Sequence, residues 1–134
     1  MIFYKKGYKY QLSADYFHRL SFQCPPKFID TKYIKLNSES SLLIADGYAW
    51  DGPSGPAIDT NNFMRGSLVH DALYQLIRNQ YLDYDPYRKF ADEELRKICL
   101  EDGMSKIRAW WVYRAVRDFG GPAARGHRAY LSAP

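Results

Sequence analysis

Residues 51–79 read DGPSGPAIDTNNFMRGSLVHDALYQLIRN, and the pattern of secondary structure changes within this stretch. Two prolines and two glycines in residues 51–56 predict a loop, because proline breaks helices and cannot donate to a strand ladder. Thr60 or Asn61 can cap a helix that follows. Apolar side chains then recur at helical spacing to about residue 79. The expected core stripe of this helix is Phe63, Val69, Leu73, Leu76 and Ile77.

The fifty residues before this loop contain short runs in which apolar and polar side chains alternate imperfectly. Residues 8–12 and 16–22 are predicted as one antiparallel pair of strands, with a turn at residues 13–15. Residues 33–36 and 41–50 are predicted as a second pair around the polar turn at residues 37–40. Two adjacent prolines at positions 25 and 26 separate the pairs.

Two further helices are predicted after the first. One runs from about residue 88 to 102 and ends at Gly103, and the next runs from 105 to 119 and ends at Gly120-Gly121-Pro122. Strands followed by helices predict an α+β fold, in which antiparallel β-hairpins precede three helices and the first two helices pair around a His/Asp site. We expect a single domain over residues 1–121, with a β-rich part at 1–50 and a loop and helical part at 51–121. A basic tail at residues 122–134 follows it.

The composition is that of one globular domain. The chain has 134 residues, 46% of them hydrophobic and 25% charged, which excludes wholesale disorder. Two cysteines exclude a disulfide framework and favour a reducing compartment such as the cytoplasm. A net charge of +4 is too mild to indicate a nucleic-acid partner. No signal peptide or membrane span is expected.

Of the three histidines, His70 alone lies inside a firmly predicted element. At helical spacing it shares one side of the first helix with Tyr74 and Ile77, next to the core stripe. On the second helix Asp92 lies three and seven residues before Leu95 and Cys99, which places it on the buried side. A buried carboxylate is costly unless it is paired or hydrogen-bonded.

We therefore expect Asp92 to meet His70 across the helix pair, with Tyr74 hydrogen-bonded nearby. A carboxylate on one imidazole nitrogen fixes the tautomer and leaves the other nitrogen available as a base. Two simpler interpretations remain open. His70 can be a core histidine with a satisfied hydrogen bond, and Asp92 can favour the N-terminus of its own helix.

The Gly/Pro loop suggests a cation site. A loop held open by Gly52 and Gly55 can direct successive carbonyl oxygens at one point, which suits a hard cation, and Asp71 would add a charged ligand. A cation beside a histidine-activated water would make an ester hydrolase. The alternative is a tight turn whose glycines serve the backbone alone.

Three motifs carry a resemblance: WDGPSG at residues 50–55, HDALY at 70–74 and ADEE at 91–94. Their order is similar to that in the secreted phospholipase A2 superfamily. The closest likeness is to its disulfide-free type in parvovirus capsid proteins, and DPY at residues 85–87 is similar to a short link there. The whole chain also resembles a family of small phage and bacterial proteins of unknown function that share the Trp-Asp-Gly loop and the His-Asp-Ala-x-Tyr helix.

The resemblance implies a calcium-dependent hydrolase of phospholipid or a related ester. His70 would be the general base on water, Asp92 its orienting partner and Tyr74 the support of Asp92. The resemblance also implies Ca²⁺ as cofactor and a phospholipid or membrane surface as partner. The implied metal ligands are the Asp71 carboxylate and the backbone oxygens of Trp50, Gly52 and Ser54.

Three alternatives are weighed against this. The first is a non-enzymatic phage or bacterial protein, for example a virion or tail component that binds other phage structural proteins. The second, an HD-type metallophosphohydrolase, needs more histidine ligands, but His18 and His127 lie in a strand and in the tail. Zinc held by Cys24 and Cys99 is weaker still, because neither cysteine has a second ligand at metal spacing. The oligomeric state is not indicated.

The third helix has two interpretations. Trp110 and Trp111 can form an aromatic and basic face for lipid headgroups, together with the basic residues Lys106, Arg108, Arg114 and Arg117. We favour instead an ordinary packed stripe with a solvated basic face; the expected stripe is Ile107, Trp111, Val112, Ala115, Val116 and Phe119. The basic tail can contact anionic lipid, nucleic acid or a protein partner.

Overall fold

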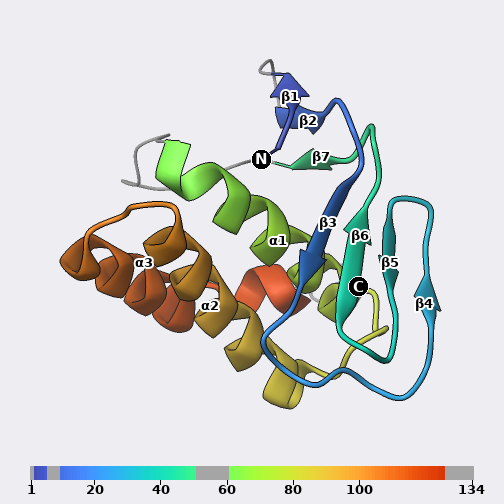
Figure 1. Cartoon of the computed structure of the whole chain (residues 1–134). Helices are drawn as coiled ribbons and strands as arrows, with labels where there is room; N and C mark the ends of the chain where they lie inside the picture. Colours follow the sequence, from blue (N-terminus) through green and yellow to red (C-terminus); the bar gives the residue numbers. More distant parts are fainter. Residues whose placement is uncertain (1, 6–9, 51–60, 126–134) are drawn as a thin grey trace, which may run out of the picture. The chain divides into compact units, whose positions relative to one another are not determined.

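The computed structural model describes residues 2–5, 10–50 and 61–125 of the chain. The chain divides into two compact units, Met1–Pro56 and Ala57–Pro134, and each is described by itself. The first unit contains antiparallel strands and the second contains helices (Figure 1). The predicted α+β class is therefore confirmed.

The first unit contains two small antiparallel sheets. One has the order β1-β2-β7, and its strands are β1 (Tyr4–Lys5), β2 (Tyr10–Leu12) and β7 (Ala49–Trp50). The other has the order β3-β6-β5-β4, and its strands are β3 (Tyr16–Arg19), β4 (Ile29–Asp30), β5 (Ile34–Leu36) and β6 (Ser41–Ile44). Alternate residues of β2, β3, β5 and β6 are buried, as the period of two in a strand requires.

One predicted strand pair is confirmed in part and the other is wrong. The predicted strand at residues 41–50 is divided into β6 and β7, which belong to different sheets. β5 and β6 form a hairpin. Asn37 Oδ1 stabilises its turn by accepting hydrogen bonds from the backbone amides of Glu39 at 2.9 Å and Ser41 at 3.0 Å. β2 and β3 do not pair with each other; β2 pairs with β1 and β7, whereas β3 pairs with β6. The turn residues instead carry the chain from one sheet to the other, with the Ser13 amide bonded to the carbonyl of Phe3 at 2.7 Å. Alternation identifies strands, but it does not identify their partners.

The second unit is built on three helices: α1 (Asn61–Arg78), α2 (Tyr84–Glu101) and α3 (Lys106–Phe119). The bounds of α1 and α3 agree with the prediction to within about one residue. α2 begins four residues earlier than predicted, across a kink at Asp85 that precedes Pro86. α2 ends as expected, because Gly103 takes a positive φ of 97°.

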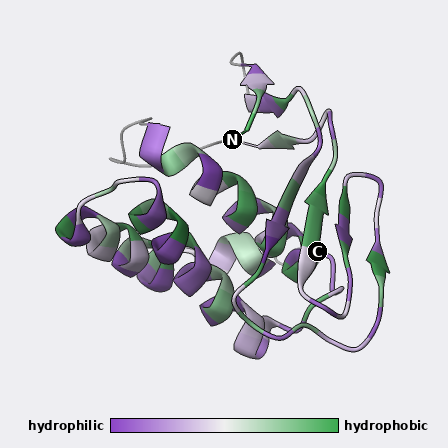
Figure 2. Cartoon of the chain, viewed as in Figure 1, coloured by the Kyte–Doolittle hydropathy of each residue, from purple (hydrophilic) through white to green (hydrophobic). Residues whose placement is uncertain are grey.

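α1 and α2 approach each other closely at Gly66. A Cβ atom at this position would lie 2.9 Å from Leu95 Cδ1 and 3.2 Å from Cys99 Sγ, so the contact depends on glycine. Arg65 also joins α1 to the end of α2 through ion pairs to Glu101 at 2.9 Å and Asp102 at 3.0 Å. In Figure 2, hydrophobic and hydrophilic residues alternate along each helix.

The expected packed stripe of α3 is confirmed at Val112 and Val116, which pack in the core cluster, and is wrong for its other residues. Ile107, Trp111 and Phe119 are 74%, 63% and 80% exposed, and the buried residues of the helix are Ala109 and Val112. These two pack with Leu95 and Cys99 of α2 in the core cluster. Small residues therefore allow α3 to lie close to α2, and the helix turns its largest apolar side chains outward.

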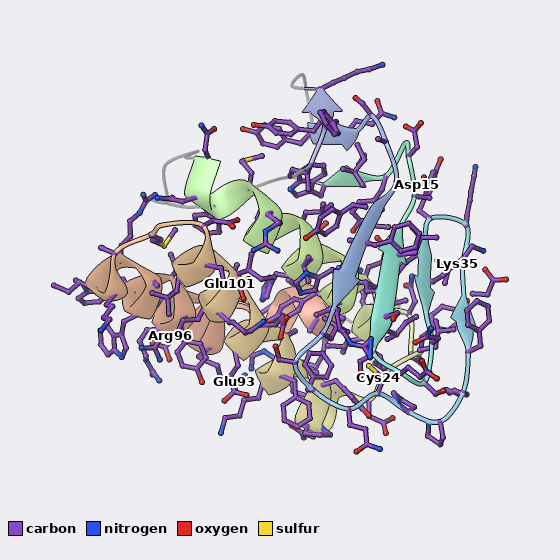
Figure 3. The ribbon with its side chains drawn as sticks, in the orientation of Figure 1. Asp15, Cys24, Lys35, Glu93, Arg96 and Glu101 are labelled. Carbon is purple, nitrogen blue, oxygen red and sulfur yellow. The ribbon has the colours of Figure 1, made fainter. Side chains whose placement is uncertain are left out.

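The outer surface of α2 is polar. Glu93 and Glu101 are exposed and Arg96 is partly exposed. Figure 3 labels these three side chains. No helix in the described part of the chain is long and apolar enough to cross a bilayer.

Candidate functional site

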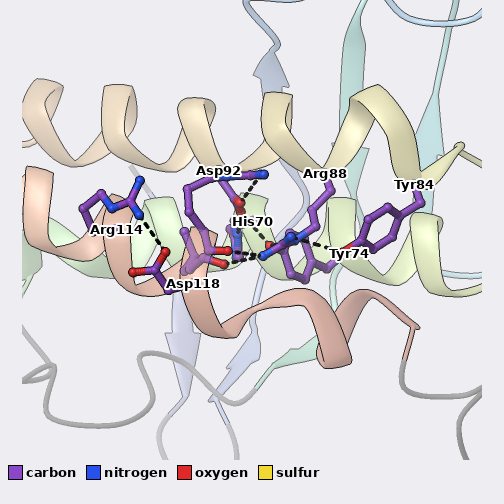
Figure 4. A network of polar contacts seen from close by, with 9 residues as sticks. His70, Tyr74, Tyr84, Arg88, Asp92, Arg114 and Asp118 are labelled. Carbon is purple, nitrogen blue, oxygen red and sulfur yellow. Dashed lines mark hydrogen bonds and ion pairs between the residues drawn. The ribbon is translucent and has the colours of Figure 1, made fainter.

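His70 and Asp92 meet between α1 and α2. Nε2 of His70 lies 2.7 Å from Oδ1 of Asp92 (Figure 4). The Asp92 side chain is completely buried, and that of His70 is 13% exposed. The contact expected from helical spacing is therefore present, with the imidazole at the edge of the core.

Both carboxylate oxygens of Asp92 are engaged. The Tyr74 hydroxyl donates to Oδ1 at 2.7 Å, and Nη1 of Arg117 donates to Oδ2 at 2.9 Å. A buried carboxylate is tolerated when it is paired and hydrogen-bonded, and here a cation and two further donors meet it. Helices α1 and α3 supply all three donors.

The partners of Asp92 determine the tautomer of His70. A carboxylate accepts hydrogen bonds and donates none, so Nε2 carries the proton. Nδ1 is then the unprotonated nitrogen of the neutral ring. Within the described residues, Nδ1 makes no hydrogen bond. The arrangement therefore leaves one basic nitrogen uncommitted at a partly exposed position.

Tyr74 is a firm donor to Asp92. Burial raises the pKa of Tyr74 well above its usual value of 10.0, and the hydrogen bond to Asp92 and the negative charge of Asp92 raise it further. Arg88 opposes these effects but does not outweigh them. The hydroxyl consequently stays protonated. Its ring also lies against that of His70, with centroids 4.1 Å apart.

Arg88 forms a second layer around this network. Its Nε donates to the Tyr74 hydroxyl at 3.2 Å, and its Nη1 donates to that of Tyr84 at 3.1 Å. Its Nη2 donates to the carbonyls of Val116 at 2.8 Å and Arg117 at 2.7 Å. Arg88 thus fixes the end of α3 to α2, and this is the segment that directs Arg117 at Asp92.

The chain after α3 passes close to Tyr74. A Cβ atom at Gly120 would lie 2.5 Å from the Val116 carbonyl oxygen and 2.7 Å from the Tyr74 hydroxyl. Glycine is needed here because no side chain fits between α3 and this hydroxyl.

Sequence reasoning missed Arg88 and Arg117. Arg117 was assigned to a solvated basic face, but its side chain is only 25% exposed and pairs with Asp92. A signal exists for Arg88, which precedes Asp92 by four residues and so lies on the same buried face of α2. For Arg117 the signal is weaker, because it depends on knowing which face of α3 is packed.

The predicted calcium ligands are only partly described. Asp71 follows His70 on α1 and is partly buried. Trp50 lies in β7 of the first unit and is 1% exposed. The centroids of its ring and that of Tyr10 are 5.6 Å apart. Gly52 and Ser54 lie outside the described residues. A carboxylate with backbone carbonyl oxygens is a donor set that suits Ca²⁺.

A metal site built from several ligating side chains differs from the expected calcium site, which is built mainly from backbone oxygens. Over residues 2–5, 10–50 and 61–125, no group of three or more His, Cys, Asp and Glu side chains could hold a metal ion. The expected calcium site contains only one such side chain, Asp71, so it is not of this kind.

The Cys99 thiol is buried in the core cluster beside Leu95. Burial, and then the negative charge of Asp102, raise the pKa of the Cys99 thiol to about 12. The thiol therefore stays protonated in the core, and a protonated thiol is a poor nucleophile. The uncommitted Nδ1 of His70 is better suited to act on water.

No protein-family model, curated protein or solved structure matches this chain. Its function is therefore inferred from the chemistry of the site.

Proposed function

We propose that this protein is a calcium-dependent hydrolase of phospholipid or a related carboxylic ester, similar to phospholipase A2. One observation carries the proposal: His70 Nε2 lies 2.7 Å from the buried Asp92 carboxylate, while Nδ1 is left without a hydrogen bond among the described residues. A base oriented in this way needs no nucleophilic side chain, because water can be the nucleophile.

In the proposed reaction Nδ1 of His70 removes a proton from water as the water oxygen attacks the ester carbonyl carbon. Asp92 accepts the Nε2 hydrogen bond throughout and stabilises the imidazolium that forms. The imidazolium then returns the proton to the departing alkoxide as the carbon–oxygen bond breaks. The products are a free fatty acid and an alcohol, and His70 is neutral again.

Tyr74 and Arg117 hold the carboxylate in position for this cycle. They occupy Oδ1 and Oδ2 of Asp92 at 2.7 and 2.9 Å, so the carboxylate is held against rotation away from His70. We assign both as positioning residues. Bound calcium would polarise the ester carbonyl and stabilise its developing negative charge. Asp71 and the backbone oxygens of Trp50, Gly52 and Ser54 are the proposed ligands.

The test is release of labelled fatty acid from the sn-2 position of phosphatidylglycerol vesicles, with calcium and with a chelator. Wild type should hydrolyse the lipid only with calcium. His70→Gln should lower the rate by at least about 100-fold, the usual contribution of a general base. His18→Gln is the matched control, because His18 is the other histidine among the described residues and makes no hydrogen bond with Asp92. Hydrolysis by His70→Gln at the wild-type rate would contradict the proposal.

The calcium part is tested separately. Asp71→Asn should weaken calcium binding in a calorimetric titration and should leave the His70–Asp92 contact intact. Asp118→Asn, which alters an exposed carboxylate of α3, serves as its control. Equal calcium affinity in wild type and Asp71→Asn would remove Asp71 from the ligand set.

A second candidate is a non-enzymatic phage or bacterial structural or interaction protein, such as a virion or tail component, that retains this scaffold. The exposed apolar residues of α3 favour it, because such surfaces often mark interaction sites. In this case the network around Asp92 would only stabilise the core. Wild type that neither binds millimolar calcium nor releases fatty acid would select this candidate.

A further inference from the structure

The outward face of α3 is apolar and aromatic, and the proposed hydrolysis does not use it. Ile107, Trp110, Trp111 and Phe119 are 74%, 44%, 63% and 80% exposed. Ile107 and Trp111 are four residues apart and share one side of the helix with Trp110. The two indole rings meet edge to face, with centroids 5.1 Å apart. We call Ile107, Trp110 and Trp111 the α3 face; Phe119, nine residues after Trp110, lies at the end of the helix on a different side.

Basic side chains lie among these aromatic residues. Lys106 precedes Trp110 by four residues, and Arg114 follows it by four, so both cations flank the indoles on the helix surface. α3 contains four basic residues and one acidic residue, Asp118, which pairs with Arg114 at 2.7 Å. Arg117 is turned inward to Asp92. The exposed charges of α3 itself are therefore net positive beside the indoles.

We infer that the α3 face binds the surface of an anionic phospholipid bilayer. Indole rings are enriched at the boundary between headgroups and acyl chains, where an apolar ring and a polar N–H are both accommodated. Basic residues beside them are attracted to anionic headgroups. The chemistry of Trp110, Trp111, Lys106 and Arg114 fits this boundary on both counts.

A second copy of the chain fits the α3 face less well. If each large side chain offers roughly 150–250 Å², the three expose about 300–450 Å² together, less than the roughly 800 Å² per partner of a standard interface. A two-fold contact would also bring the same positive patch of each copy together. A bilayer requires no minimum contact area and supplies the opposite charge.

The same helix also reaches the candidate site, because Arg117 near its C-terminal end pairs with Asp92. Binding through the α3 face would hold the helical unit at a lipid surface. The inference extends the proposed function without depending on it, since binding can be measured where hydrolysis cannot occur.

The experiment uses the full-length chain and vesicles of ether-linked phosphatidylcholine, with and without ether-linked phosphatidylglycerol. These lipids contain no carboxylic ester at the chains, so hydrolysis cannot alter the vesicles. Binding is measured by co-sedimentation and by the shift of tryptophan emission. Trp50 is buried, so an emission change reports on the two exposed indoles. We expect binding and a blue shift with phosphatidylglycerol, weaker binding without it, and weaker binding at high salt.

Two variants and a control separate the contributions. Ile107→Ser with Trp111→Ala should weaken binding on the order of tenfold, and both side chains are exposed enough to be replaced without unfolding. Lys106→Gln should weaken binding about fivefold on anionic vesicles only. Phe28→Ala removes an aromatic ring that is 61% exposed in the first unit, and it should bind as wild type does.

Several outcomes would overturn the inference. The first is that wild type does not bind vesicles. The second is that the Ile107/Trp111 variant binds as strongly as wild type, and the third is that wild type binds neutral and anionic vesicles equally. A dimer that forms with concentration and is dispersed by Trp111→Ala would assign the α3 face to a second copy instead. Loss of hydrolysis in the His70→Gln variant with normal vesicle binding would leave the inference supported, which separates it from the proposed function.

Discussion

Asp92 is a fully buried carboxylate that accepts hydrogen bonds from His70, Tyr74 and Arg117. Sequence reasoning found Asp92, His70 and Tyr74, because their helical spacing places each at the border of a packed face. It did not find Arg117, because hydropathy treats an arginine as a surface residue whatever it pairs with. The two donors other than His70 that hold Asp92 are Tyr74 and Arg117, and each can be tested by substitution.

The first prediction concerns the hydroxyl of Tyr74. Tyr74→Phe leaves Asp92 one donor short and removes an acceptor from Arg88, so it should lower the free energy of unfolding by about 1–3 kcal/mol. Tyr113→Phe is the control, since this hydroxyl has no hydrogen-bond partner among the described residues, and its effect should stay within about 0.5 kcal/mol. Urea unfolding measures both, and equal effects would contradict the assigned role.

The second prediction concerns pH. The raised pKa of Tyr74 means that the folded protein retains a proton which the unfolded chain releases above about pH 10. This contribution to stability is therefore constant below pH 10 and is lost as the pH rises, by up to about 1.4 kcal/mol per unit. The stability advantage of wild type over Tyr74→Phe should shrink between about pH 10 and 11. An advantage that is independent of pH would contradict the prediction.

The third prediction concerns Arg117. Arg117→Met leaves Oδ2 of a buried carboxylate unpaired and should destabilise the protein by about 3–5 kcal/mol. Arg114→Met removes a cation from the same helix, but its ion pair with Asp118 is exposed, so the cost should stay below about 1 kcal/mol. Thermal unfolding of the two variants provides the comparison, and similar losses would mean that Arg117 does not support Asp92.

Among the secondary-structure elements, the helices were predicted best and the strand pairing least well. Capping and terminating residues such as Ser105 and Gly103 mark helix ends locally, whereas β3 pairs with β6, a strand more than twenty residues away. The packed face of α3 was also wrong in part, because a helix with apolar residues on several sides does not show which side its neighbour covers.

The fourth prediction tests the close approach after α3. Gly120→Ala would place a Cβ atom 2.7 Å from the Tyr74 hydroxyl, so the chain or the tyrosine must shift. We expect a loss of about 1–3 kcal/mol, the usual cost of an overpacked site. Gly121→Ala is the neighbouring control, where the nearest atom would be the Tyr84 hydroxyl at 3.2 Å. Circular dichroism during urea unfolding measures both, and a Gly120→Ala variant as stable as Gly121→Ala would contradict this account.

Over the whole molecule, the helical unit contains the proposed catalytic residues and the α3 face, and the strand unit contains Trp50. The patterns of predicted strands and helices along the chain predicted the class of the fold. They could not predict that the mild positive charge is used in two ways on α3, with Arg117 turned to a buried carboxylate and Lys106 exposed beside two indoles. That division depends on how α3 is rotated against α2, which is a property of the packed structure.

The central claim is that Asp92 fixes His70 as a base with an open Nδ1, and the tautomer of His70 tests it most directly. The measurement is a long-range ¹⁵N–¹H correlation spectrum of the full chain at mildly alkaline pH, with the His70 signals assigned from their loss in His70→Gln. We predict a neutral ring with its proton on Nε2, donated to Asp92, and an unprotonated Nδ1. A ring with its proton on Nδ1 would contradict the account, because that nitrogen could not then remove a proton from water.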